Sequence, residues 1–249
     1  MSHKNNGKTQ KTAFYILLVY IACQLSSLLL LIPSVRDLFL NYIGNDTVAI
    51  YSLTAWWSTI AFAIAFVISI ILILKNKNFW NIFKGEKTSI GSAILWGILG
   101  FFLVLFGQMI GANIEVAIGI DYGSENTETL LRVTEIAPIM ILSTVLLGPF
   151  LEELIFRRVV FGSLVQTQNF WIAGIISSIV FGAIHLDFTH IILYTISGFI
   201  FAFLYYKTKR LLTSIIAHIM LNGFVVITQL NYDALKEMQN ALQFFIFIQ

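Results

Sequence analysis

Apolar residues dominate this 249-residue chain in long runs that short polar stretches separate. Seven runs can be drawn, at residues 13–32, 52–74, 90–112, 136–160, 171–185, 191–206 and 211–230. Most approach the roughly 20 residues that an α-helix needs to cross about 30 Å of hydrocarbon; the fifth and sixth, near 15, need tilt or cover from neighbours. The pattern predicts an all-α, polytopic membrane protein of about seven transmembrane helices, with residues 1–249 forming a single integral membrane domain. A last apolar piece, 241–249, is too short to span.

The composition agrees with this class of protein. Hydrophobic residues make up 58% of the chain and charged residues only 11%, against about 25% charged in globular domains. A net charge of +2 gives no reason to expect a nucleic-acid partner, so the lipid bilayer is the expected surrounding. The single cysteine, Cys23, lies inside the first run, cannot form an intramolecular disulfide, and is expected to be a small buried residue.

Charge indicates how the chain is oriented. With a cytoplasmic N-terminus, twelve of the fifteen basic residues fall on the inner side, in residues 1–12, 75–89, 157–158 and 207–210. Ten of the thirteen acidic residues fall on the outer side. This bias follows the positive-inside rule and supports an odd number of spans. We therefore expect a multi-pass protein of the cell membrane with its N-terminus in the cytoplasm.

The longest connection, residues 113–137, is external and acidic in this arrangement. A short amphipathic helix over 127–134, covering an entrance, is one interpretation, and a solvated loop is the favoured one.

In the third run, Gly107 and Gly111 form a G-x-x-x-G pattern, which lets another helix approach closely.

A few ionisable and polar groups interrupt the later spans. An ionisable side chain at the centre of a spanning helix costs about 2.5–3.5 kcal/mol on insertion scales, so such groups indicate a functional site by default. They are Glu152, Glu153, Arg157, Arg158, His185, His218 and Asn222.

Spacing predicts which of these groups meet. Glu153 and Arg157, four residues apart, are expected to form an ion pair. Glu152 points about 100° away around the helix and is left without a partner. His218 and Asn222 share one helix face, as do Phe181 and His185. The sequence therefore predicts a polar site buried between the fourth, fifth and seventh helices.

Pro149 stands three residues before Glu152. A proline inside a helix removes one backbone hydrogen bond and clashes with the preceding turn. With Gly148 before it, the helix is expected to kink or restart there. Backbone groups left unpaired within a membrane persist only where they face protein or a water-filled cavity, so water is expected near Glu152.

Three motifs in the second half resemble one known family. P-F-L-E-E-L-I-F-R, F-G-A-I-H and H-I-M-L-N lie on successive polar spans, between residues 138 and 222. They are similar to the CPBP family of intramembrane proteases, which includes the CAAX prenyl endopeptidases and the Abi-type bacteriocin-processing and immunity proteins. Residues 138–222 are the expected family core, about a third of the chain.

The resemblance implies peptide-bond hydrolysis within the bilayer. It implies that Glu152 and His185 activate a water, and that His218 and Asn222 steady the oxyanion. Glu153, Arg157, Phe181 and Pro149 would then support these residues. Glu152, His185 and His218 could also hold a zinc ion with one open position; no H-E-x-x-H motif is present, and a metal-free glutamate protease is the favoured alternative.

The expected partner is a membrane-associated peptide or protein substrate, in peptide (pheromone or bacteriocin) maturation or self-immunity; the oligomeric state stays open. A non-catalytic binding or immunity protein of the same fold is the main alternative. A structural polar network and a proton-coupled transporter are others, although the related halves of transporters are absent from this sequence. His190 and Asp187 are interpreted as loop residues facing solvent, and Arg158 as an inner-side anchor.

Overall fold

Helices form most of the computed structural model, which describes residues 3–44, 46–121, 123–232, 234 and 236; the 241–249 piece lies outside them. No strand occurs within those ranges. The α-helices are α1 (His3–Ser26), α2 (Pro33–Ile43), α3 (Thr47–Leu74), α4 (Ile90–Ala117), α5 (Glu125–Ile136), α6 (Gly148–Glu152), α7 (Gly162–Leu164), α8 (Phe170–Ala183), α9 (Ile191–Thr208) and α10 (Leu211–Leu230). A 3₁₀ segment, Ser27–Leu31, prolongs α1.

Each of the seven predicted runs falls on a helical stretch. Five stretches in the described part of the chain are long and apolar enough to cross a membrane: Gly7–Leu31, Thr47–Leu74, Ile90–Ala117, Ile191–Thr208 and Leu211–Leu230. The two remaining runs correspond to α8, which is short, and to the helical stretch that contains α6 and α7. The all-α, polytopic class predicted from the sequence is confirmed.

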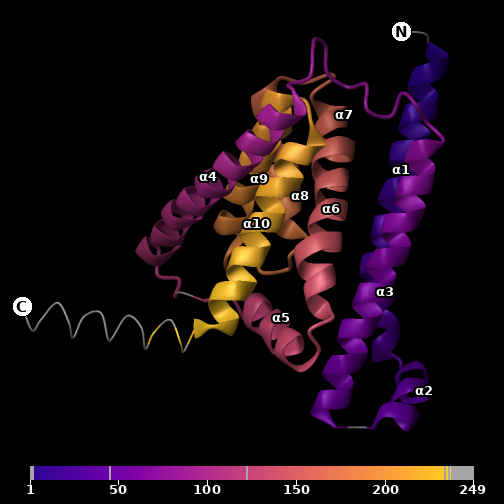
Figure 1. Cartoon of the computed structure of the whole chain (residues 1–249), viewed down its shortest axis with the longest axis vertical. Coiled ribbons are helices and arrows are strands. Elements are labelled where there is room, and N and C mark those ends of the chain that lie inside the picture. Colours follow the sequence, from indigo (N-terminus) through magenta and orange to yellow (C-terminus); the bar gives the residue numbers. More distant parts are fainter. Residues whose placement is uncertain (1–2, 45, 122, 233, 235, 237–249) are drawn as a thin grey trace, which may run out of the picture.

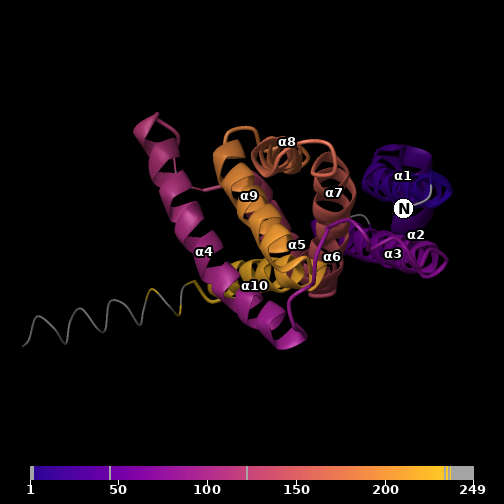
Figure 2. The same cartoon turned by 90° about the horizontal axis from the view of Figure 1, so that it is seen from above.

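The helices stand side by side in two groups (Figures 1 and 2). α1 and α3 pair with each other at one side, next to α6 and α7. α4, α8, α9 and α10 form the other group, in which α9 packs against α8, α4 and α10. α6 and its neighbouring turns lie between the groups, so the stretch that carries the two glutamates touches both.

Small residues bring α4 close to α9. A Cβ atom added at Gly107 would lie 2.7 Å from Ile200 Cδ1, and one added at Gly111 would lie 3.0 Å from Ile196 Cδ1. Real side chains do not tolerate the first of these distances. The G-x-x-x-G pattern of the third run therefore does mark a close helix–helix approach.

Two π-helical segments surround α6. Leu142–Leu147 precedes it and Glu153–Phe161 follows it, and with α7 they form one continuous helical stretch over residues 142–164, which we call the Glu152 helix. The amide of Gly148 donates to the carbonyl of Ser143, five residues back. The sequence predicted a kink or restart at Pro149. The structure instead has an unbroken helix, in which a π-helical segment gives way to an α-helical one at Gly148. Such π segments frequently mark functional sites.

The connection over residues 113–137 is not the solvated loop that the sequence favoured. α4 continues through Glu115 to Ala117, and residues Glu125–Ile136 form α5. Ser124 starts α5 because its hydroxyl accepts a hydrogen bond from the amide of Thr127. α5 packs against α3 and α10, so the amphipathic interpretation was the correct one.

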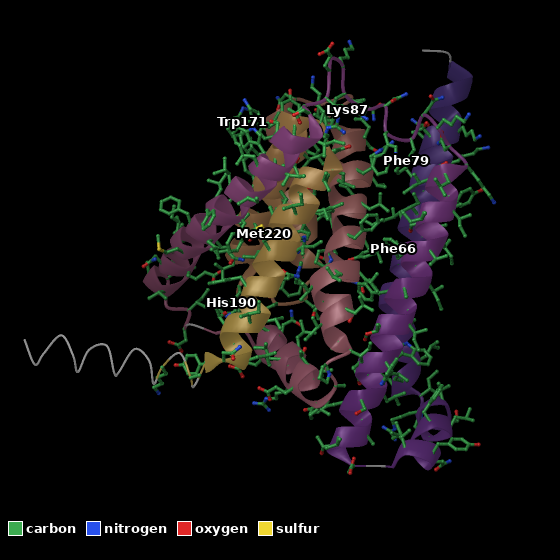
Figure 3. The ribbon with its side chains drawn as sticks, viewed as in Figure 1. Phe66, Phe79, Lys87, Trp171, His190 and Met220 are labelled. Carbon is green, nitrogen blue, oxygen red and sulfur yellow. The ribbon has the colours of Figure 1, made fainter. Side chains whose placement is uncertain are left out.

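One end of the molecule, which we call the basic end, holds Lys8, Lys11, Lys87, Lys207 and Lys209. The first turns of α1 and the connection that holds Lys87 lie at this end, and α2, α5 and His190 lie at the other (Figures 1 and 3). Arg158 belongs to the basic end, but it is buried instead of reaching the surface. Its Nε donates to the carbonyl of Phe79 at 2.7 Å, and its guanidinium lies 4.0 Å from the centre of the Phe79 ring.

Replacing Gly107 by leucine should separate α4 from α9. Because this position has no room for a Cβ atom, the overpacked variant should lose about 1–3 kcal/mol of stability. Thermal unfolding in detergent measures the loss. Gly91→Leu on the same helix is the matched control, since nothing lies within 4 Å of a Cβ there; equal melting temperatures for the two variants would contradict the close approach.

Candidate active site

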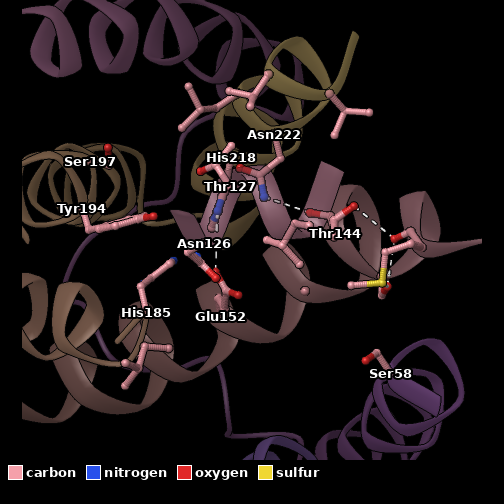
Figure 4. Close-up of a pocket in the computed structure, with 18 of the residues that line it drawn as sticks. Ser58, Asn126, Thr127, Thr144, Glu152, His185, Tyr194, Ser197, His218 and Asn222 are labelled. Carbon is pink, nitrogen blue, oxygen red and sulfur yellow. Dashed lines mark hydrogen bonds and ion pairs between the residues drawn. The ribbon is translucent and has the colours of Figure 1, made fainter. Parts of the chain in front are cut away.

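A cavity of about 520 Å³ opens beside the Glu152 helix (Figure 4). Five of the residues predicted from the sequence line it: Glu152, Phe181, His185, His218 and Asn222. Their elements are α6, α8 with the turn that follows it, and α10, so the structure brings together the three spans that the motifs indicated. Pro149, Glu153 and Arg157 do not line the cavity, and they are buried in or behind its wall.

The two adjacent glutamates have different surroundings. The Glu152 side chain borders the cavity and is 16% exposed, whereas the Glu153 side chain is fully buried. This follows from helical geometry, because consecutive side chains point about 100° apart. Only Glu152 can therefore reach a substrate or a water in the cavity.

Glu153 is held by a buried ion pair. Its Oε2 lies 3.1 Å from Arg157 Nε, as a close charge pair without the alignment of a hydrogen bond, and neither side chain is exposed. Arg157 also donates from Nη2 to the carbonyl of Gly198. Its guanidinium lies 4.3 Å from the centre of the Phe181 ring and 5.0 Å from that of Phe201. The predicted Glu153–Arg157 pair is present, and aromatic rings enclose it.

His218 bridges the two glutamates. Its Nδ1 lies 2.9 Å from Glu153 Oε1, and its Nε2 lies 3.6 Å from Glu152 Oε2. The imidazole also stacks on the Phe201 ring, with 4.6 Å between the ring centres. The contact with Glu153 was not foreseen from the sequence. It gives this carboxylate a second task, which is to fix the orientation of the His218 ring.

His185 lies just beyond the end of α8, and its tautomer follows from its partner. Nδ1 lies 2.8 Å from the carbonyl oxygen of Phe181, which only accepts hydrogen bonds, so Nδ1 carries the hydrogen. In the neutral ring, Nε2 then keeps its lone pair free. The Phe181 ring packs edge-on against the imidazole at 4.8 Å. The F-x-x-x-H spacing therefore supplies both an orienting carbonyl and an orienting ring.

Asn222 forms a hydrogen bond with a backbone carbonyl of the Glu152 helix that Pro149 leaves without a donor. In the π-helical pattern the carbonyl of Thr144 would accept from the amide of residue 149, but proline has no amide hydrogen. Asn222 Nδ2 donates to this carbonyl at 2.8 Å and satisfies it. One of the two amide hydrogens of Asn222 is thus committed, and the other is available.

The three proposed zinc ligands do not form a metal site in this arrangement. Within the described ranges, no group of three or more His, Cys, Asp or Glu side chains is placed so that it could hold a metal ion. Nδ1 of each histidine already has a partner, so only the two Nε2 atoms and the Glu152 carboxylate could face a metal ion, and they are not placed as a ligand group. The mechanism below therefore contains no step at a metal.

Near the cavity, α5 is anchored to the turn that carries His185. Ser124 Oγ donates to Asp187 Oδ2 at 2.6 Å, two residues beyond His185. Asn126, Thr127 and Leu130 of α5 line the cavity. Asp187 is thus a structural contact, not the solvated loop residue expected from the sequence.

His190 is also buried, contrary to the solvent-facing interpretation. Its Nδ1 lies 2.8 Å from Glu115 Oε2, and Glu115 Oε1 accepts from the amide of Leu193. The hydrogen bond with Glu115 is the main reason why the pKa of His190 is raised above its usual value. This pair joins the end of α4 to the start of α9.

Sequence reasoning missed the residues whose importance comes from contacts with other elements. Tyr194 lines the cavity and stacks on His185, and Phe201 stacks on His218. Neither has a local sequence signal. Ser124 did have one, because a serine directly before an acidic first turn is typical of a helix N-cap.

Comparisons with known proteins agree with the fold and the site. The family model described as type II CAAX prenyl endopeptidase Rce1-like matches residues 134–224. The chain is 44% identical to YdiL of Bacillus subtilis (strain 168), a protein named as a membrane peptidase, over 225 residues that cover 89% of this chain and 90% of the relative. It is 36% identical to the membrane-embedded CAAX protease MroQ of Staphylococcus aureus (strain USA300) over 229 residues, 88% and 90% of the two chains. No solved structure matches the chain significantly.

These likenesses extend well beyond the three motifs, to almost the full length of two membrane peptidases. Together with the helical fold they define a multi-pass intramembrane endopeptidase. The chain belongs to the Rce1-like family of type II CAAX prenyl endopeptidases.

The His190–Glu115 pair should make stability depend on pH. Because the folded-state pKa of His190 is raised, the pair contributes fully below the usual histidine value of about 6.5 and is lost as the pH rises through the higher folded value. The melting temperature of the wild type in detergent should therefore fall between about pH 6 and pH 9 by more than that of His190→Gln. Identical pH profiles for both proteins would contradict this role.

Proposed function

We propose that the chain cleaves a membrane-associated peptide or protein with a water that Glu152 and His185 activate, without a metal ion. The observation that carries this proposal is the difference in surroundings between Glu153 and Glu152. Glu153 is neutralised by Arg157 and His218, while Glu152 borders the cavity next to both histidines. A carboxylate at the edge of a poorly solvated cavity is suited to act as a general base.

The attacking water would bind between Glu152 and His185. One hydrogen of the water points to the Glu152 carboxylate, and the other points to the lone pair on His185 Nε2, which the Phe181 carbonyl leaves free. The water oxygen attacks the carbonyl carbon of the peptide bond and Glu152 takes a proton. Glu152 then gives this proton to the nitrogen of the leaving amine, and the C–N bond breaks. Glu152 and His185 return to their starting states, one water is consumed, and the two products are a carboxylic acid and an amine.

Charge on the tetrahedral intermediate needs hydrogen-bond donors. When both of its ring nitrogens are protonated, His218 donates from Nδ1 to Glu153 and presents its Nε2 hydrogen near Glu152. The second amide hydrogen of Asn222 lies on the same helix face. Donors that are already oriented stabilise an oxyanion without reorganisation, and removing one typically costs about 10²–10³ in rate.

The metal-free mechanism is supported by the placement of Glu152, His185 and His218 relative to one another. A zinc ligand must offer a free lone pair. Each histidine still presents Nε2, but Glu152, His185 and His218 are not placed as a group of three that could hold a metal ion. The arrangement suits water activation by carboxylate and imidazole better than coordination by three ligands.

The expected substrate is a membrane-associated peptide whose cleavage site lies near the end of the molecule that carries α5. With the N-terminus in the cytoplasm, the positive-inside rule places that end at the outer face of the cell membrane. Maturation of an exported peptide, such as a pheromone or bacteriocin, fits this side, and self-immunity by cleavage fits equally. A prenylated C-terminal peptide is the first probe to test, because the matching family model describes a prenyl endopeptidase.

Glu152→Gln should abolish turnover while leaving the fold intact. The amide cannot take the proton of the water, so kcat should fall by at least about 10². The assay uses quenched fluorescent apolar peptides, with and without a farnesylated cysteine, and protein reconstituted in vesicles. Glu86→Gln, at an exposed position of the basic end, is the matched control and should behave as wild type.

Two outcomes of that assay would overturn the proposal. Cleavage by Glu152→Gln at the wild-type rate would favour a binding or immunity protein of the same fold. Activity that a chelator removes and added zinc restores would contradict the metal-free mechanism.

The orientation can be tested with single cysteines, because Cys23 is the only cysteine in the chain. In a Cys23→Ser background, Tyr42→Cys on α2 and Lys77→Cys at the basic end are both exposed. A membrane-impermeant maleimide added to intact cells should label position 42 and spare position 77. The reverse labelling would place the α5 end in the cytoplasm.

A further inference from the structure

Tyr194 is a cavity residue that the mechanism above does not use. It lies in the first turn of α9 and lines the same cavity as Glu152 and His185. Its ring is nearly parallel to the His185 imidazole, with 4.1 Å between the ring centres and 22° between the planes. Phe181 packs edge-on against the same imidazole at 4.8 Å. The tyrosine is therefore fixed against one of the two groups that would activate the water.

The stacking directs the Tyr194 hydroxyl into the cavity. Figure 4 shows the phenol oxygen pointing away from the body of α9, toward the space bounded by His185, His218 and Asn126. Among the residues that the structure describes, no hydrogen-bond partner of this hydroxyl is found. A phenol is a hydrogen-bond donor that usually finds a partner when it is partly buried.

The other donors near the cavity are partly committed. The Nδ1 hydrogen of His185 goes to the Phe181 carbonyl, so neutral His185 presents only an acceptor. Asn222 gives one of its amide hydrogens to the Thr144 carbonyl. The hydroxyl of Tyr194 is a neutral donor near Glu152 and His185, and it is not committed to another hydrogen bond in the described part of the chain.

We propose that Tyr194 is a further catalytic residue, whose hydroxyl donates a hydrogen bond to the substrate carbonyl oxygen as this oxygen becomes the oxyanion. The inference rests on the proposed hydrolysis at Glu152 and adds a donor from α9 to those from α10. The bond forms only as negative charge develops, so it accelerates turnover without tightening substrate binding. No proton leaves the phenol at any step.

Tyr194→Phe is the decisive variant, because it keeps the stacked ring and removes only the oxygen. Its kcat on the quenched fluorescent peptides should fall about 10²-fold, with KM unchanged within about twofold and the melting temperature unchanged. Tyr206→Phe on the same helix, at an exposed position outside the cavity, is the matched control and should keep wild-type kinetics.

A second variant separates the hydroxyl from the ring. Tyr194→Leu removes both, and it should lose at least as much kcat as Tyr194→Phe. If Tyr194→Phe turns over like wild type while Tyr194→Leu does not, the ring only positions His185 and the proposal is wrong. If Tyr194→Phe raises KM at constant kcat, the hydroxyl contacts only the bound substrate, which also overturns it. A wild type that cleaves no better than Glu152→Gln would instead refute the proposed function itself.

Discussion

The buried pair of Glu153 and Arg157 is the interaction on which the rest of the site depends. Two charges without exposure to water cost several kcal/mol each unless they are paired and hydrogen-bonded. Here the pair is enclosed by Phe181 and Phe201 and is completed by His218. One carboxylate is thereby used to hold an arginine and an imidazole in place. The neighbouring carboxylate, Glu152, remains available at the cavity, which explains why two adjacent glutamates are needed in so apolar a chain.

The unusual helix around these glutamates serves the same arrangement. A π-helical turn ahead of Pro149 leaves the Thr144 carbonyl without its backbone donor, and Asn222 from α10 supplies one. Because Pro149 has no amide hydrogen to donate, the Thr144 carbonyl is free to hold Asn222 of α10 in place. Together with the His218–Glu153 contact, this bond ties α10 to the Glu152 helix at two points. Each of these bonds lowers the cost of holding a polar group inside a bilayer.

Much of this architecture is readable from the sequence, because the bilayer imposes strong local rules. Run length predicted the helices, and spacing predicted the Glu153–Arg157 pair and the shared faces of Phe181 with His185. The contacts that the sequence could not reveal join residues of different elements: Glu115 with His190, Ser124 with Asp187, and Tyr194 of α9 with His185 in the turn after α8. Asp187 and His190 lie between two apolar runs and therefore looked like solvated loop residues. Only the packing of α5 and α9 over the cavity shows otherwise.

The central claim is that Glu153 and Arg157 form one energetic unit, and a double-mutant cycle of unfolding free energies tests it directly. Removing one partner of a buried pair leaves an uncompensated charge and costs about 3–5 kcal/mol, whereas replacing both is far less costly. Arg157→Met alone should therefore be more destabilising than Arg157→Met combined with Glu153→Gln, with a coupling energy of at least about 1 kcal/mol. Strictly additive losses would mean that the two side chains do not depend on each other, and the account of the site would be wrong.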